Sequence, residues 1–290
     1  MYELTLELCK TNVDFIKFQI LLSNEFHEQH NSYATIQNSI FDKEQWLALF
    51  TAVRSAGKEI LAMPVDLHAL QWLISQKVIR NIEVHSVNLF RGDFWEELTR
   101  NPNTCNLFLS ISGYLDNEIN FILSQYNEAF ENIILMYGFQ NFPTDPTAIN
   151  LARISEYQKK FKCPIGYADH SSFTDSWDHL LAMAVTQSSS FIEKHFVLEQ
   201  GSKRIDYESA IGVNSANETK EKIDYYINTL GSNKNARLNA QELNYRARRL
   251  TLTDLELKSG EVGYRWLKNV NNADPLVEFR NYFAAQNRQV

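Results

Sequence analysis

The sequence lacks the features that would place it in a membrane or outside the cell. It has no apolar run approaching the ~18 residues that suggest a membrane span. Its first ten residues, MYELTLELCK, carry acids where a secretory signal peptide carries bases. The three cysteines, Cys9, Cys105 and Cys163, are widely spaced, which makes a poor disulfide framework and fits a reducing compartment. We therefore predict a soluble, cytoplasmic protein that does not enter a membrane.

Basic charge and glycine-rich phosphate loops are also scarce. The net charge of -7 and the pI of about 5.6 argue against nucleic acid as a main partner, because phosphate binding favours a basic face. No glycine fingerprint follows the first apolar run, so a dinucleotide-binding fold is disfavoured. Hydrophobic residues make up 44% of the 290 residues, enough for the core of one large domain, with or without an appendage.

What the sequence does contain is an alternation of short apolar runs and longer amphipathic stretches. Residues 43–57 illustrate the second kind, since Trp46, Leu49 and Val53 fall at helical spacing. We expect further helices over 1–14, 117–130, 148–161 and 220–231. Strands that alternate with helices predict a parallel sheet. The seven runs expected to be strands are 15–19, 59–65, 81–87, 106–112, 132–139, 163–169 and 190–198.

Seven strands are one short of a closed (β/α)8 barrel. The first run follows an expected helix, which should itself follow a strand. We therefore predict an α/β protein with a (β/α)8 TIM barrel that lacks its first strand, through a misplaced start or real loss. An open seven-stranded sheet is the alternative. Residues 1–235 would form the barrel. Residues 236–290, with more Asn and Arg and little periodicity, would form a short C-terminal appendage.

Polar residues gather at the ends of these apolar runs, where barrels carry their chemistry. Lys17 and Gln19 share one face of the first strand by period-two alternation, as Glu193 and His195 do in the last. Buried polar groups are costly unless they are paired or used, so FIEKHFVL (191–198) indicates a site. The other polar ends are Asp66, His85, Ser86, Ser112, Gln140, Asp169 and His170.

Two of these segments resemble the paired signature of the sialic acid synthases. GYADHS (166–171) is similar to the family's G-x-S-D-H-T, and FIEKHFVL is similar to its E-[KR]-H-F-T. RRLTLTDLELKSGE (248–261) resembles the opening of the family's C-terminal antifreeze-like domain, cut short here. Five more pieces resemble the family in the same order: IKFQ (16–19), residues 41–66, SISG (110–113), YGFQNFPT (137–144) and RIDYESA (204–210).

The resemblance implies a reaction and a set of site residues. The family condenses phosphoenolpyruvate with an N-acetylated hexose, such as N-acetylmannosamine, to a nonulosonic (sialic-type) acid. The enol carbon attacks the sugar aldehyde, water adds, and phosphate leaves. His170 and His195 would hold a divalent metal, typically Mn²⁺, that polarises the aldehyde. The catalytic candidates are Lys17, Asp206 and Glu193, and the substrate-binding candidates are Lys17, Gln19, Ser86, Ser112, Gln140 and Asp206.

The resemblance also implies that the protein works in a pathway that makes surface sugars. A homodimer is the assembly that the resemblance suggests.

Two departures from the family pattern keep other functions open. The family's A-E-I-G-x-N-H-like first strand is absent, and Glu83 stands where the family has a lysine. A carboxylate at ~4 Å would oppose an anionic ligand by ~4 kcal/mol. One alternative is a non-catalytic barrel that binds a sugar or protein partner. Another is a barrel aldolase or hydrolase that uses the same metal.

Overall fold

The computed structural model describes residues 1–23, 33–37, 40–76, 79–100, 106–130, 132–138, 141–231 and 238–244. It divides the chain into two compact units, Met1–Leu230 and Gly231–Val290. In the second unit, residues 240–244 form a helix whose start is capped by Asn239, which accepts a hydrogen bond from the backbone of Glu242 at 2.9 Å. The antifreeze-like segment (248–261) lies outside the described residues, so the predicted appendage stays a prediction.

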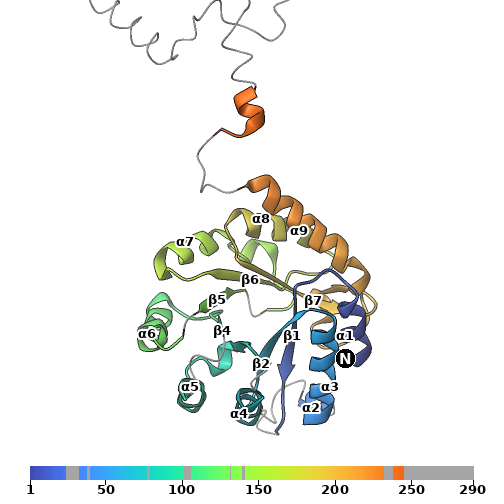
Figure 1. Cartoon of the computed structure of the whole chain (residues 1–290), viewed down its shortest axis with the longest axis vertical. Coiled ribbons are helices and arrows are strands. Elements are labelled where there is room, and N and C mark those ends of the chain that lie inside the picture. The colour runs from blue at the N-terminus through green and yellow to red at the C-terminus, as the bar shows by residue number, and fades with distance from the viewer. Residues whose placement is uncertain are drawn as a thin grey trace, which may run out of the picture. The chain divides into compact units, whose positions relative to one another are not determined.

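The first unit contains one curled parallel sheet of eight strands in chain order, counted over its described residues (Figure 1). Each strand is parallel to the next, as the alternation of strand and helix requires. The strands are β1 (Phe15–Ile20), β2 (Glu59–Pro64), β3 (Asn81–Val84), β4 (Asn106–Ser110), β5 (Ile133–Tyr137), β6 (Ile165–Asp169), β7 (Phe191–Val197) and β8 (Ala210–Gly212).

Helices surround the outer face of this sheet (Figure 1). Two of them have side-chain caps at their first turns: Asp42 caps α3 in a capping box with Gln45, and Asp66 caps α4. The α-helices are α1 (Tyr2–Cys9), α2 (Tyr33–Gln37), α3 (Lys43–Ser55), α4 (Leu67–Ser75), α5 (Gly92–Thr99), α6 (Asp116–Tyr126), α7 (Ala152–Phe161), α8 (Trp177–Thr186) and α9 (Ala216–Leu230). None of the helices in the described part of the chain is both long and apolar enough to cross a membrane.

The predicted (β/α)8-type fold is confirmed, and all seven predicted strands are present as β1–β7. The predicted strand over 81–87 ends early at Val84, because Ser86–Asn88 turns into a short 3-10 helix that His85 caps. One strand was not predicted: β8, which has only three residues. A further strand before α1 would precede Met1, so that part of the prediction remains untested.

Alternating side chains divide the core between two sides of the sheet. In β1, Ile16, Phe18 and Ile20 point outward and pack under the helices, whereas the alternate residues point into the barrel. The floor of the barrel interior is apolar and aromatic. Phe191 of β7 makes edge-to-face contacts with Phe15 of β1 and with a phenylalanine of β4. The floor therefore joins the first strand of the sheet to the seventh across the interior.

The two ends of this unit also meet outside the sheet. The backbone N–H of Asn12, before β1, donates a 2.7 Å hydrogen bond to the side chain of Asn217 in α9. Lys220 of α9 lies 3.7 Å from Asp14. The residues that lead into β1 are therefore tied to the helix that follows β8.

Candidate functional site

A cavity of about 410 Å³, counting the open space at its mouth, lies inside the barrel above the aromatic floor. Its walls come from every strand from β1 to β7, because period-two alternation points every second residue inward. Above the floor, the inward side chains form a charged middle layer and an upper layer that holds three histidines.

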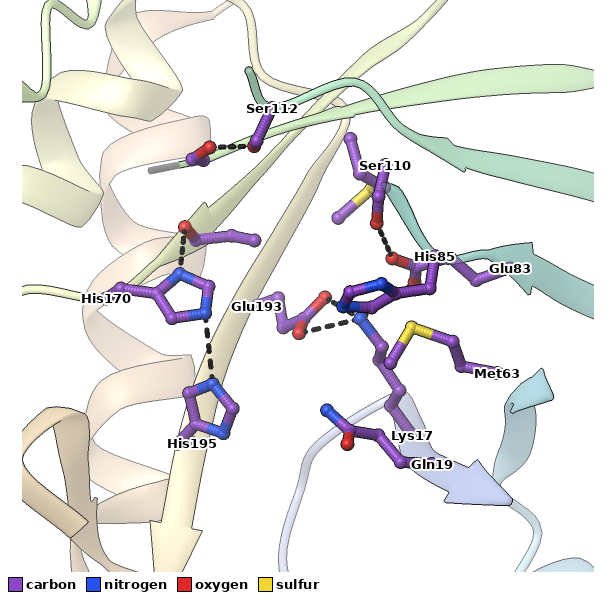
Figure 2. A pocket seen from close by; sticks show the side chains of 13 residues that line it. Lys17, Gln19, Met63, Glu83, His85, Ser110, Ser112, His170, Glu193 and His195 are labelled. Carbon is purple, nitrogen blue, oxygen red and sulfur yellow. Dashed lines mark hydrogen bonds and ion pairs between the residues drawn. The ribbon is translucent and has the colours of Figure 1, made fainter. Parts of the chain in front are cut away.

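The middle layer centres on Lys17 of β1 (Figure 2). Its Nζ lies 2.8 Å from Oε2 of Glu83 on β3, and 2.9 and 3.0 Å from the two carboxylate oxygens of Glu193 on β7. The hydroxyl of Ser110 on β4 donates a 2.5 Å hydrogen bond to the other oxygen of Glu83. The side chain of Glu83 is 1% exposed. One ammonium therefore links two carboxylates from strands on opposite sides of the interior.

Burial and ion pairing shift the pKa values of these three groups in opposite directions. Burial lowers the pKa of Lys17, but Glu193 and Glu83 outweigh it and raise that pKa above its ordinary value, so the ammonium stays protonated. Burial raises the pKa of Glu193, but Lys17 and then His195 more than offset it, and the net shift is downward. For Glu83, burial wins over Lys17 and the pKa is raised. Of the two acids, Glu193 is the one held as a carboxylate.

The upper layer brings His170, which follows β6, against His195 of β7 (Figure 2). Their Nε2 atoms are 3.2 Å apart, and the rings meet edge to face. Nδ1 of His170 is 3.1 Å from the carbonyl oxygen of Ala168. Since a carbonyl only accepts hydrogen bonds, Nδ1 carries a proton, and the nitrogen that is left to offer a lone pair to a metal is Nε2, which faces His195. Burial, followed by His170, lowers the pKa of His195 to about 4, which keeps that ring neutral.

These two nitrogens fit a metal ion. Neutral imidazoles are common metal ligands, and two ligands about 2.2 Å from one ion at right angles are about 3.1 Å apart. Among the described residues, no group of three or more His, Cys, Asp or Glu side chains is arranged to hold a metal. An ion at His170 and His195 would therefore take its remaining ligands from water or substrate, which suits a metal with mostly oxygen ligands.

His85, which follows β3 and is one of the polar strand ends noted in the sequence, also lines the cavity, although the family resemblance assigns it no role. Its Nδ1 accepts a 3.2 Å hydrogen bond from the backbone N–H of Val87, so Nε2 carries the proton of the neutral ring. Burial, then Lys17, lowers the pKa of His85 to about 4. His85 therefore offers the cavity an uncharged donor. Its period-two spacing from Glu83 is the signal that could have placed it inside.

Most of the predicted site residues line this one cavity: Lys17, Gln19, Ser112, His170, Glu193 and His195. Ser112 donates to the backbone carbonyl of Gly138. Ser86 is not among the lining residues; it is buried in the 3-10 helix after β3, and its carbonyl accepts from Tyr114 at 2.6 Å.

The remaining predictions have other outcomes. Asp206 also lies outside the cavity lining, in a left-handed conformation (φ 59°). Burial raises its pKa, while His170 acts in the opposite direction. Gln140 is outside the described residues. Asp169, one of the predicted polar strand ends, accepts hydrogen bonds from Lys194, Tyr167 and Ser171.

The NeuB family model matches residues 7–235, more than three quarters of the chain. The chain belongs to the NeuB family. An uncharacterised protein of Methanocaldococcus jannaschii is 24% identical over 267 residues, covering 89% of this chain and 76% of that protein. The N,N'-diacetyllegionaminic acid synthase of Campylobacter jejuni is 20% identical over 178 residues, covering 61% of this chain and 52% of the synthase.

Solved structures agree on the fold. The N-acetylneuraminic acid (sialic acid) synthetase of Leptospira borgpetersenii, in complex with citrate, superimposes with a TM-score of 0.77 at 22% identity, over 86% of this chain and 85% of that one. A truncated 3-deoxy-D-arabino-heptulosonate 7-phosphate synthase of Thermotoga maritima gives 0.61 at 12% identity, over 79% and 83%. At these sequence identities, the structural similarity establishes the NeuB-type barrel fold. The reaction depends on the residues of the site.

Proposed function

We propose that this barrel condenses phosphoenolpyruvate with an N-acetylated hexose of the N-acetylmannosamine type. The product would be a nonulosonic acid, formed when C3 of phosphoenolpyruvate bonds to the aldehyde carbon, water adds at C2, and phosphate leaves. The observation that carries the proposal is the convergence of His170 and His195 at 3.2 Å, above a lysine–glutamate pair, in a NeuB-family barrel.

The histidines would hold a divalent metal, proposed to be Mn²⁺, which supplies Lewis-acid polarisation of the sugar carbonyl when bound. Lys17 and Gln19 face the cavity from β1 and would donate hydrogen bonds to the anionic groups of phosphoenolpyruvate. The Ser112 hydroxyl would join them by exchanging its bond to the Gly138 carbonyl for one to the substrate. Glu193 stays ionised and would accept from a sugar hydroxyl or from the attacking water. Asp206 would bind sugar hydroxyls. The substrate roles proposed for Ser86 and Gln140 rest on the sequence alone.

Glu83 is compatible with an anionic substrate in a way that the sequence did not suggest. Its carboxyl group is paired with Lys17, accepts from Ser110, and has a raised pKa, so it is not a free negative charge facing the ligand. The same contacts support a second candidate function. Because Lys17 already contacts two acids, it is less available to phosphate, which favours a barrel that binds a sugar without catalysis.

The proposal is tested by measuring phosphate release from phosphoenolpyruvate with Mn²⁺ and a panel of N-acetylated hexoses. We expect release that requires both metal and sugar and is lost in His195→Ala. His179→Ala is the matched control, since His179 is exposed on α8 and lies outside the cavity. No release from folded wild-type protein would contradict the synthase. Calorimetric binding of one hexose in that case would favour the binding module.

A further inference from the structure

A second polar cluster lies beside the histidine pair, and the proposed chemistry leaves it unused. Lys194 precedes His195, and its Nζ lies 2.5 Å from a carboxylate oxygen of Asp169, the residue before His170. The Lys194 side chain is 2% exposed and that of Asp169 is 0% exposed. An ion pair removed from solvent to this degree carries a large desolvation cost, so its position calls for an explanation.

The strand register explains why this pair accompanies the histidines. Asp169 of β6 and Lys194 of β7 are direct neighbours in the parallel ladder. Successive side chains point to opposite faces of a sheet, so the residue after each of them points into the barrel. Those residues are His170 and His195. The end of β6 and the middle of β7 therefore each carry a dipeptide with one histidine inside the barrel and one charged residue on the outer face.

The remaining hydrogen-bonding atoms of the outer pair are also satisfied. Asp169 accepts from the hydroxyls of Tyr167 at 2.8 Å and Ser171 at 2.9 Å, and Lys194 also donates to the carbonyl of Ser171 at 2.9 Å. These bonds fix the backbone on both sides of His170. A fully satisfied buried network holds a geometry more rigidly than apolar packing alone.

The carbonyl group of His170 is held as well. It accepts from the backbone N–H of Thr144 at 2.8 Å and from the hydroxyl of Ser209 at 2.8 Å. The backbone of His170 is thus tied to the chain before α7 and to the 3-10 helix before β8. From the β7 side, Lys194 links to this arrangement through the Asp169 carboxylate and the Ser171 carbonyl.

We propose that Asp169 and Lys194 are positioning residues for the histidine pair. Their ion pair locks the end of β6 to the middle of β7 on the outer face, and thereby sets the separation of the two Nε2 atoms on the inner face. The metal-binding part of this inference rests on the proposed function. The separation of the two Nε2 atoms does not rest on the proposed function, because it is a property of the metal-free protein.

The experiment compares the full-length wild type with Lys194→Met, which keeps the length of the side chain and removes its charge. The matched control is Leu107→Ala, a buried residue at the N-terminal end of β4 whose substitution also lowers thermal stability. Mn²⁺ affinity is measured by calorimetry without substrate. Crystal structures of the metal-free proteins give the distance between the two Nε2 atoms. Asp169→Asn, which preserves shape, replaces Lys194→Met if the latter does not fold.

We expect Mn²⁺ affinity to fall about 10–100-fold in Lys194→Met, the range found when the support of a metal ligand is removed. We expect the two nitrogens to move out of contact in the same variant, while Leu107→Ala retains both affinity and separation. Unchanged affinity and an unchanged 3.2 Å separation in Lys194→Met would overturn the inference. If the wild type binds no Mn²⁺, the proposed metal site is wrong, and the crystal structures alone decide whether the ion pair positions the histidines.

Discussion

At the scale of single residues, the balance of charge inside the barrel depends on Lys17. Its ammonium group lies within 3.0 Å of oxygen atoms from both Glu83 and Glu193, and it is the shared partner of the two acids. Removing one partner from a buried ion pair is more damaging than replacing the whole pair, because it leaves an uncompensated charge. The three residues should therefore respond very differently to substitution.

We predict that Lys17→Met lowers the free energy of unfolding by about 3–5 kcal/mol, since it leaves two acids without a cation. Glu83→Gln should cost much less, because the pair of Lys17 and Glu193 remains. Urea unfolding monitored by circular dichroism measures both. Lys160→Met, which removes a surface pair with Asp116, is the control and should cost less than about 1 kcal/mol. A milder effect for Lys17→Met than for Glu83→Gln would contradict this account.

His85 makes a prediction about pH. Its folded pKa of about 4 lies below the ordinary value of 6.5, so the unfolded chain takes up a proton at a pH where the folded chain does not. The free energy of unfolding therefore falls as the pH falls from about 6.5 to 4, by up to about 3 kcal/mol from this residue. Lys17 and His170 add to the lowering and Glu193 opposes it.

The contribution of His85 is measured as a difference between two proteins, because other groups titrate in the same range. His85→Asn is the comparison variant, since an asparagine oxygen can replace Nδ1 as acceptor for Val87. Urea unfolding in metal-free buffer should show a smaller loss of stability between pH 6.5 and 4 in His85→Asn than in the wild type. Parallel curves for the two proteins would show that His85 does not contribute.

At the scale of elements, the close approach of β5 and β6 supports the upper layer of the site. A Cβ added at Gly138, just after β5, would collide with the carbonyl oxygen of Ala168 in β6. That same oxygen receives the Nδ1 proton of His170. Only a glycine allows the two strand ends to approach closely enough for this arrangement.

We predict that Gly138→Ala lowers stability by about 1–3 kcal/mol and weakens Mn²⁺ binding, because the Ala168 carbonyl must move. Gly92→Ala is the matched control: Gly92 begins α5 and has no atom within 4 Å of an added Cβ, so its substitution should be neutral. Thermal unfolding and metal titration compare the two variants. Equal behaviour of the two would mean that the strand ends can shift without cost.

The sequence predicted the elements with long, strongly patterned segments and missed those without them. Residues 43–57 carry a complete apolar stripe, and α3 follows it closely. β8 has only Ala210–Gly212, which is too short for alternation to be visible. The strand predicted over 81–87 extends past the end of β3, because the His85 side chain bonds the local backbone and starts a 3-10 turn that the sequence pattern did not reveal.

Within the site, period-two spacing correctly put Lys17 with Gln19 and Glu193 with His195 on inward faces. It could not reveal that Lys17 bridges Glu83 and Glu193, because that contact crosses the barrel interior between strands far apart in the chain. From the sequence alone, Glu83 is therefore expected to repel an anionic ligand. A charge can be evaluated only with its partner, and the partner is set by tertiary structure.

At the scale of the whole molecule, the core of the first unit is contained within Met1–Leu230. The NeuB family match ends close by, at residue 235. We predict that a protein ending at residue 235 folds on its own, with one cooperative thermal transition within a few degrees of that of the full chain. Circular dichroism during heating measures this. Loss of the cooperative transition would show that residues 236–290 contribute to the stability of the barrel.

The paired dipeptides, Asp169-His170 at the end of β6 and Lys194-His195 within β7, also restrict how this part of the sequence can change in length. Deleting or inserting one residue between Phe191 and Lys194 would exchange the two faces of β7, bringing the lysine into the cavity and turning His195 toward the helices. A two-residue change would restore the faces but displace the histidine by about 7 Å along the strand. Length variation in this region is therefore confined to the connections around the strands, and β7 itself can change only by substitution.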